Sequence, residues 1–407
     1  MASEIPLASS SMPLSTRGRA VDPFLVMDLV ARANALEASG RSIIHMEVGQ
    51  PGTPAPACAR AALAAAMGTS SLGYTESLGL PALRAGIAAM YRARYGVEVA
   101  PERVIITAGS SAAFILAFTA LFDAGDRVAL GEPGYPSYKA LLTALSVQPV
   151  GIATSAANRF QPTPADLAAC GGGVRGLIVA SPANPTGTIL TKEELAALAA
   201  AAEAAGVALV SDEIYHGLEY AGAPRAASAL EVTERCYVIS SFSKFFSMTG
   251  WRIGWMIVPA AHVRTVERLA QNLFICAPHA SQVAALAALG AAEELEANRL
   301  VYAANRQLML ERLPRAGFPS FAPPNGAFYV YCDVGGIAGA GVSTALCEEL
   351  LADAGVAATP GWDFDAKRGG ATVRFSYARS TADVAEGLRR LEAWWAKRAA
   401  ARGSEEA

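Results

Sequence analysis

Lysine and cysteine are both scarce in this sequence. Only five of the 407 residues are lysine, so a lysine in an apolar context needs an explanation. The cysteines show no CxxC motif and no close pair, which argues against a zinc site and against a disulfide framework. We therefore expect no metal centre, and thiols that are reduced and buried. The six cysteines are Cys58, Cys170, Cys236, Cys276, Cys332 and Cys347.

Long apolar runs and an excess of basic charge are also absent. No apolar run approaches the roughly 20 residues that a membrane-spanning helix needs. The N-terminal stretch carries Glu4 before any basic residue and has no continuous apolar core, so it does not resemble a secretory signal. A formal net charge of −3 gives no reason to expect nucleic acid or an acidic membrane as a partner. We expect a cytoplasmic protein with a small-molecule substrate.

The residues that are present predict an α/β fold. Hydrophobic residues make up 53% of the chain, and 407 residues leave room for one large domain and a smaller one. From Arg103 to Val258, short apolar runs such as "RVIIT", "VALVSD" and "CYVISS" alternate with alanine-rich helical stretches. This alternation predicts a doubly wound, mostly parallel sheet covered by helices. Ligands of such sheets bind beyond the carboxyl ends of the strands.

The pattern changes near residue 295. A long helical stretch runs from about Ala291 to Leu313, and turn-rich and further α+β sequence follows it. We expect a large domain at 56–295, a smaller α+β domain built from 18–55 and 296–400, and an N-terminal tail at 1–17.

Polar residues follow two of the predicted strands. Asp212 comes directly after the apolar run "VALVS", and Tyr215 lies three residues later. A helix N-cap explains this aspartate about as well as a functional role does. Asn184 follows the neighbouring run in "SPANPTG", where a simple turn is the better explanation of the residue taken alone. Neither residue decides a function by itself.

A third strand end carries a candidate anion site. Gly109, Ser110 and Ser111 lie between the predicted strand "VIIT" and a helix. Free backbone N–H groups and the helix dipole favour an anion such as phosphate at this position. The turn has neither the GxGxxG nor the GxxxxGK[ST] spacing, so the anion is not explained by a dinucleotide fingerprint or a Walker loop.

Lys244 is the lysine whose context needs an explanation. It follows an apolar run and lies among serines and phenylalanines in "SSFSKFF". One interpretation is a stem lying on the aromatic rings with the ammonium in water. Against it, Ser241 and Ser243 add hydroxyls, and Arg252, eight residues on, is suited to phosphate. A lysine desolvated near other cations has a lowered pKa and can form a Schiff base. A lysine of this kind, together with an anion site and an acidic residue that can pair with a pyridinium nitrogen, indicates a pyridoxal-phosphate site.

Eight segments, in the same order, resemble the class I/II aminotransferases, which are fold-type I pyridoxal-phosphate enzymes. The resemblance extends from about Gly18 to about Trp395. The segments read "EVGQPGTPAP", "GYTESLGLPALR", "EPGYPSY", "SPANPTG", "SDEIYHGLEY", "SFSKFFSMTGWRIGW", "PPNGAFYVY" and "TVRFSYA".

This resemblance implies a role for each matching residue. Lys244 would carry the cofactor and act as general acid and base, and Asp212 would pair with the protonated pyridine nitrogen. Tyr215 and Asn184 would hydrogen-bond the 3-oxygen of the ring, and Tyr135 would stack on it. The phosphate would be held by Gly109, Ser110, Ser111, Ser241, Ser243, Arg252 and, from the second subunit of a homodimer with shared active sites, Tyr74.

The resemblance also implies how substrate binds. Arg374 would grip the substrate α-carboxylate, supported by Asn184 and by the backbone at Gly49. Two departures argue against an aspartate-specific enzyme. The segment "NLFICAPHA" offers only His279 as a second cation, and Ser111 stands where some relatives carry a lysine.

The expected function is exchange of an amino group between an α-amino acid and a 2-oxo acid, with 2-oxoglutarate as acceptor. The resemblance implies a ping-pong mechanism through pyridoxamine phosphate. A fold-type I lyase is the alternative, acting by β-elimination or like an aminocyclopropane-carboxylate synthase, because the same residues support that chemistry. The effector domain of a transcription regulator would need a helix-turn-helix ahead of residue 18, and we expect the tail to be too short for one.

Overall fold

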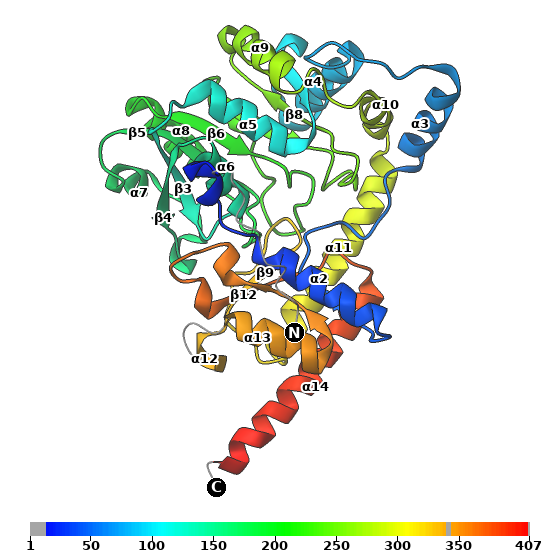
Figure 1. The fold of residues 1–407 in the computed structure, drawn as a ribbon, viewed down its shortest axis with the longest axis vertical. Helices are drawn as coiled ribbons and strands as arrows, with labels where there is room; N and C mark the ends of the chain where they lie inside the picture. The colour runs from blue at the N-terminus through cyan, green and yellow to red at the C-terminus, as the bar shows by residue number, and fades with distance from the viewer. Residues whose placement is uncertain (1–13, 339–342, 406–407) are drawn as a thin grey trace.

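The computed structural model describes residues 14–338 and 343–405, and its centre is a seven-stranded sheet (Figure 1). The strand order is β2-β8-β7-β6-β5-β3-β4, and every neighbouring pair is parallel except the two that involve β8. The predicted doubly wound, mostly parallel sheet is therefore confirmed. Its strands are β2 (Val104–Thr107), β3 (Arg127–Glu132), β4 (Gln148–Ala153), β5 (Val174–Ala180), β6 (Ala208–Asp212), β7 (Cys236–Ser241) and β8 (Gly254–Ile257).

Helices cover both faces of this sheet. Successive strand residues point to opposite faces, so Ile106 and Leu177 join one apolar core while Ile105 and Ile178 join another. The first core is completed by α3 (Ala57–Thr69), α4 (Pro81–Tyr95), α7 (Pro164–Ala169), α8 (Lys192–Ala204) and α10 (His279–Ala288). The second is completed by α5 (Gly109–Leu121), α6 (Pro136–Ala144) and α9 (Val263–Leu273).

A smaller α+β body lies below the large sheet in Figure 1. Its antiparallel sheet has the order β11-β12-β9, and β1 pairs with β10 beside it. Its strands are β1 (Ile44–His45), β9 (Tyr329–Asp333), β10 (Val356–Ala357), β11 (Thr359–Pro360) and β12 (Thr372–Ser376). Its helices are α2 (Leu25–Ala38), α12 (Gly335–Ala338), α13 (Ser343–Glu349) and α14 (Thr381–Glu405), and the short α1 (Thr16–Arg19) precedes α2.

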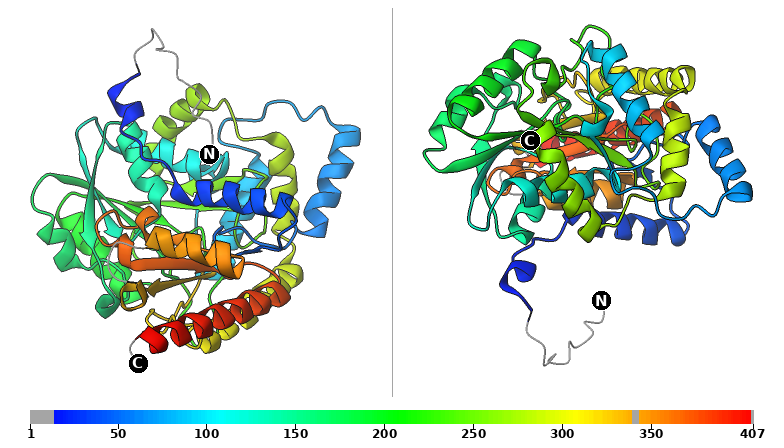
Figure 2. Two further views of the ribbon diagram at one scale, coloured as in Figure 1. Left: turned by 60° about the horizontal axis from the view of Figure 1, so that its bottom comes forward. Right: turned by 90° about the horizontal axis from the view of Figure 1, so that it is seen from above.

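One long helix, α11 (Ala292–Arg312), connects the two bodies (Figure 1). Its Leu295 packs in the core of the large sheet, whereas Tyr302 and Met309 pack in the core of the small one. We therefore propose the division expected from the sequence, with 56–295 as the large domain and 18–55 with 296–400 as the small one. Figure 2 shows α2 lying across the junction of the two bodies.

Within the described part of the chain, none of the helices combines the length and the apolar character that a bilayer crossing requires.

Candidate active site

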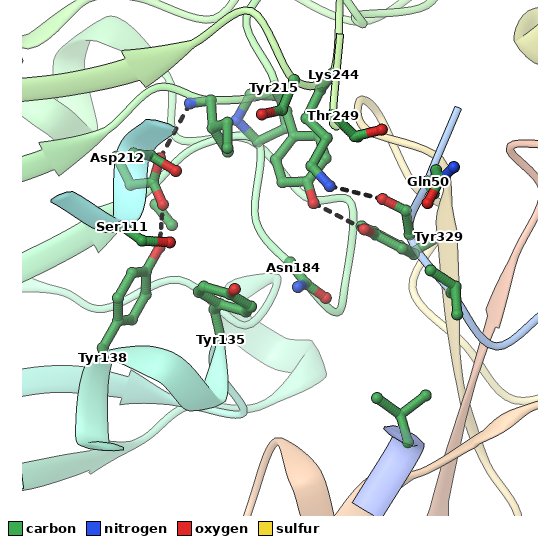
Figure 3. Close-up of a pocket in the computed structure, with 18 of the residues that line it drawn as sticks. Gln50, Ser111, Tyr135, Tyr138, Asn184, Asp212, Tyr215, Lys244, Thr249 and Tyr329 are labelled. Atoms are coloured by element: carbon green, nitrogen blue, oxygen red, sulfur yellow. Dashed lines mark hydrogen bonds between the residues drawn. The ribbon is translucent and has the colours of Figure 1, made fainter. Parts of the chain in front are cut away.

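A cavity of ≈ 270 Å³ lies beyond the carboxyl ends of β5, β6 and β7, at the junction of the two bodies. Strand ends from the large sheet supply Asp212 and Ser243, and the small sheet supplies Tyr329 and Arg374. Figure 3 shows Asp212, Ser111 and Tyr138 on one side of this cavity and Tyr215, Tyr329 and Gln50 on the other. The site therefore forms only when both bodies are in place.

The Lys244 amine points into this cavity from the loop after β7. Its Nζ donates a hydrogen bond to the carbonyl oxygen of Gly49 at 2.6 Å. The pKa of Lys244 is lowered to about 8, mainly by burial and also by the guanidinium groups of Arg374 and Arg252, while the carboxylate of Asp212 opposes the shift. Near neutral pH, much more of this amine is neutral and nucleophilic than in an ordinary lysine.

Asp212 is the last residue of β6 and is buried at the back of the cavity. Its Oδ1 accepts the backbone N–H of Ile214 at 3.0 Å, and its Oδ2 accepts the hydroxyl of Tyr138. Burial raises the pKa of Asp212 to about 6, and these two hydrogen bonds limit the rise. The hydrogen bond from the Ile214 N–H is the kind of contact that a capping aspartate makes, but the same carboxylate also lines the cavity. The cap and the functional interpretation are thus compatible.

Two tyrosines and an asparagine also line the cavity. The hydroxyls of Tyr215 and Tyr329 lie 2.7 Å apart in a hydrogen bond. Burial raises the pKa of Tyr215, so its hydroxyl stays protonated and can donate. A Cβ at Gly49 would lie 1.7 Å from the Tyr329 hydroxyl oxygen, so the tyrosine reaches this position only past a glycine. Asn184 comes from the turn after β5.

The start of α5 provides a cradle of backbone N–H groups. Gly109, the first residue of α5, has φ 74°, and Ser110 and Ser111 line the cavity. A Cβ at Gly109 would lie 2.5 Å from Nη2 of Arg252, so the guanidinium packs directly over this turn. Among the described residues, no carboxylate forms a salt bridge with Arg252. The N–H of Ser243 donates to Oγ of Ser241 at 3.1 Å and thereby fixes the neighbouring loop.

Arg374 is held between two aromatic rings. Its guanidinium carbon lies 4.4 Å from the ring centroid of Tyr329 and 4.7 Å from that of Phe364. Its Nη1 donates to Oδ1 of Asn184 at 2.8 Å, and its Nη2 donates to the carbonyl of Glu47. The guanidinium is thus fixed in position without a carboxylate, which leaves its charge for a ligand.

Comparison with known proteins agrees with this geometry. The model of the family described as "Aminotransferase class I and II" matches residues 41–391. The valine–pyruvate aminotransferase of Mycobacterium tuberculosis is 48% identical over 376 residues, which cover 92% of this chain and 96% of the relative.

This chain belongs to the class I and II aminotransferase family.

Solved structures of other family members have the same fold. An aminotransferase from Mycobacterium tuberculosis has a TM-score of 0.93 and 46% identity, covering 95% of this chain and 100% of that chain. An aspartate aminotransferase from Thermus thermophilus with maleate has a TM-score of 0.87 and 32% identity, covering 94% and 99%. The fold class inferred from the sequence, a fold-type I aminotransferase, is therefore confirmed. None of these relatives favours the lyase alternative.

The residues at the cavity fit the pyridoxal phosphate that the family implies. A buried carboxylate, Asp212, lies opposite an amine of lowered pKa, Lys244. The N-terminus of α5 and Arg252 form a cradle suited to a phosphate group. The donor set thus contains a partner for each part of the cofactor.

The structure brings together nearly all of the site residues expected from the sequence. Of the expected residues, those that line the cavity are Gly49, Ser110, Ser111, Tyr135, Asn184, Asp212, Tyr215, Ser243, Lys244, Arg252 and Arg374. Gly109 and Ser241 lie directly behind this lining. Tyr74 is elsewhere, with 83% of its surface exposed in the single chain.

Several lining residues carry no signal in the sequence that predicts a role for them. The one available signal for Tyr138 is its spacing, because it lies three residues after Tyr135 and on the same side of the first turn of α6. Tyr329 lies in the segment "PPNGAFYVY", where a tyrosine by itself indicates no particular chemistry. Phe24, Gln50 and Thr249 gave no signal, because their contacts depend on how distant segments fold together.

Proposed function

We propose that this protein is a pyridoxal-phosphate-dependent aminotransferase that exchanges the amino group of an α-amino acid with a 2-oxo acid. The observation that carries the proposal is the pairing, across one cavity, of the low-pKa amine of Lys244 with the buried carboxylate of Asp212. When bound, the cofactor supplies a carbonyl that takes up the amino group and a ring that accepts electrons from the substrate Cα.

The residues of this chain hold and orient the reactants. Asp212 favours a protonated ring nitrogen, and Tyr138 keeps the Asp212 carboxylate aimed into the cavity. In this proposal Tyr215 and Asn184 hydrogen-bond the ring oxygen. Tyr135, which lines the same cavity, stacks on the ring.

The phosphate is assigned to the cradle at the start of α5. Its backbone N–H groups and Arg252 supply the positive end of a helix and a cation at one place. The residues assigned to this group are Gly109, Ser110, Ser111, Ser241, Ser243 and Arg252, with Tyr74 from a second subunit of a homodimer.

Arg374 binds the substrate α-carboxylate, and Lys244 moves the proton. The rings of Tyr329 and Phe364 and the hydrogen bond to Asn184 fix the guanidinium of Arg374. With its carboxylate bound there, the substrate presents its α-carbon to Lys244. The Lys244 Nζ takes the proton from this carbon in one half-reaction and returns it in the other. The two half-reactions follow a ping-pong order, with 2-oxoglutarate as an acceptor. The name of the Mycobacterium tuberculosis relative adds pyruvate as a second acceptor to examine. A cytoplasmic location is part of the proposal.

The test is a half-reaction screen of the holoenzyme. We expect the absorbance of the bound cofactor to change when the preferred amino acids are added one at a time, and to return when 2-oxoglutarate or pyruvate follows. In Lys244→Ala the cofactor still binds, but turnover falls by at least about 10²- to 10⁴-fold, because proton transfer is lost along with the covalent attachment. Lys397→Ala, a change in α14 far from the cavity, is the control and keeps full activity.

Near-normal transamination by Lys244→Ala would overturn the proposal. Release of ammonia and a 2-oxo acid with no need for an acceptor would instead support the lyase.

A further inference from the structure

The first turn of α2 forms a wall of the cavity that the roles assigned above do not use. Phe24, Val26 and Met27 line the same cavity as Lys244 and Arg374. Val26 is buried, and Met27 is 57% exposed in the single chain. This wall is apolar and lies on the side of the small sheet, where Arg374 is located.

A carboxylate from a distant segment fixes this turn beside Arg374. The N-cap residue of α2 is Phe24, whose side chain makes no capping hydrogen bond. Asp363, in the short turn Gly361–Asp363, caps the helix instead: its two oxygens accept the N–H groups of Leu25 at 2.8 Å and Val26 at 2.9 Å.

The same segment also contacts the guanidinium of Arg374. Phe364, the residue after Asp363, carries one of the two rings that hold Arg374. The apolar wall and the carboxylate-binding arginine are therefore fixed by adjacent residues of one segment. The wall and Arg374 therefore line one cavity and are positioned by the same segment.

The charges around the cavity match an uncharged side chain. Within the described part of the chain, the cations that line the cavity are Lys244, Arg252 and Arg374. Lys244 contacts the carbonyl of Gly49, and Arg252 packs on the turn at Gly109. With Arg374 committed to the α-carboxylate, no lining cation in the described chain is left for a second carboxylate. Desolvating an unpaired carboxylate against an apolar wall is costly.

We infer that the first turn of α2 is the side-chain pocket of this enzyme and that it selects amino acids with apolar side chains over dicarboxylic ones. This inference rests on the proposed aminotransferase function and names its substrate class. Met27 is the specificity-determining residue at the mouth of the pocket, and Phe24 and Val26 form its base.

Leucine and aspartate are a suitable pair to test this selection, because their side chains have nearly the same branched shape and differ in charge. We expect wild-type kcat/KM to be higher for leucine. In Met27→Arg, a cation faces the side-chain pocket, so the ratio of kcat/KM for leucine to that for aspartate falls roughly tenfold or more. Ala35→Arg places the same charge eight residues on, at an exposed position about 12 Å along the helix, and leaves the ratio unchanged.

Binding gives a second readout that needs no turnover. Titration calorimetry of the holoenzyme with 4-methylpentanoate and with succinate compares unreactive acids of the same two shapes. We expect tighter binding of 4-methylpentanoate to wild type and a shift toward succinate in Met27→Arg. A wild-type preference for aspartate and succinate, or equal ratios in the Met27 and Ala35 variants, would overturn the inference. A holoenzyme that responds to no amino acid in the half-reaction screen would overturn the proposed function, and calorimetry would still decide the selectivity of the wall.

Discussion

Burial gives Lys244 its chemistry. The Lys244 Nζ lies 5.8 Å from the ring centroid of Tyr215 and 6.0 Å from that of Phe328. Desolvation by these rings penalises the ammonium, and two guanidinium groups add repulsion. The same surroundings would stabilise a neutral or covalently bound nitrogen. A single residue in an apolar loop thus becomes a nucleophile without any base beside it.

The lowered pKa of Lys244 predicts the pH dependence of cofactor uptake by the cofactor-free protein. Only the neutral amine attacks a carbonyl, so the rate of incorporation rises as pH increases through about 8 and levels off above it. A lysine with its ordinary pKa of 10.5 would still be gaining rate beyond that point. Stopped-flow absorbance between pH 6 and about pH 10 measures the profile.

The Arg374→Gln variant provides the matching check. Arg374 lowers the pKa of Lys244 by charge repulsion, so its removal moves the midpoint of the profile to higher pH. A midpoint that stays in place, or one that lies near 10.5 in the wild type, would contradict the assignment of this environment to Lys244.

At the residue scale, the sequence predicts groups whose chemistry is unusual in context. Lys244 is conspicuous in an apolar stretch, and Asp212 is conspicuous at the end of a buried strand. Tyr138 and Tyr329 are not, because a tyrosine in a helix or a strand is ordinary until its hydroxyl partner is known. Those partners, Asp212 and Tyr215, lie 74 and 114 residues away along the chain.

The N-termini of two helices, α5 and α2, border the cavity and are used in different ways. The N-terminus of α5 offers its free N–H groups to the cavity, whereas the N-terminus of α2 offers its N–H groups to Asp363. One helix start is kept open for an anion, and the other is closed by a carboxylate from the chain itself. Strand and helix periodicity predicted α5 correctly. The capping of α2 was not predictable, since Asp363 is 338 residues from Leu25.

Removal of this remote cap should loosen α2 alone. In Asp363→Ala, two N–H groups lose their acceptors, which lowers the local stability of the helix by about 1–2 kcal/mol. Amide hydrogen exchange over residues 25–38, followed by mass spectrometry, should accelerate about 5- to 30-fold. Asp22→Ala changes an exposed aspartate just before the helix and should leave exchange unchanged. Equal acceleration in both variants, or in neither, would show that Asp363 does not hold the helix.

At the scale of the whole molecule, the cavity depends on two bodies that pack around separate cores. The alternation of strands and helices in the sequence predicted the large body, and the change near residue 295 coincides with the point where α11 passes between the cores. The sequence did not predict how closely the bodies approach each other. That approach is set by contacts such as the one between the Lys244 amine and the Gly49 carbonyl.

The Tyr74 segment and the segments beside it on the large body carry exposed apolar side chains. Ser77 donates to the carbonyl of Ile275 at 2.7 Å, which places the Tyr74 segment beside the connection between α9 and α10. Large exposed apolar side chains on these and the adjoining segments are Tyr74, Leu273 and Ile275, with Met67 on α3 and Leu286 on α10. We propose that this face is covered by a second copy of the chain, since a two-fold interface buries one such patch on each subunit.

A shared active site predicts that two impaired chains can restore one another. If Tyr74 reaches the phosphate of the partner, Tyr74→Phe should weaken cofactor retention by about 1–2 kcal/mol, the value of one charge-assisted hydrogen bond. Tyr74→Ala should lose more. In a mixed dimer of Tyr74→Ala and Lys244→Ala, one site receives Lys244 from the first chain and Tyr74 from the second. That site is complete, so mixing the two variants under conditions of subunit exchange should regenerate activity. Activity in a monomer by ultracentrifugation, or no recovery after proven exchange, would show that Tyr74 does not act across an interface.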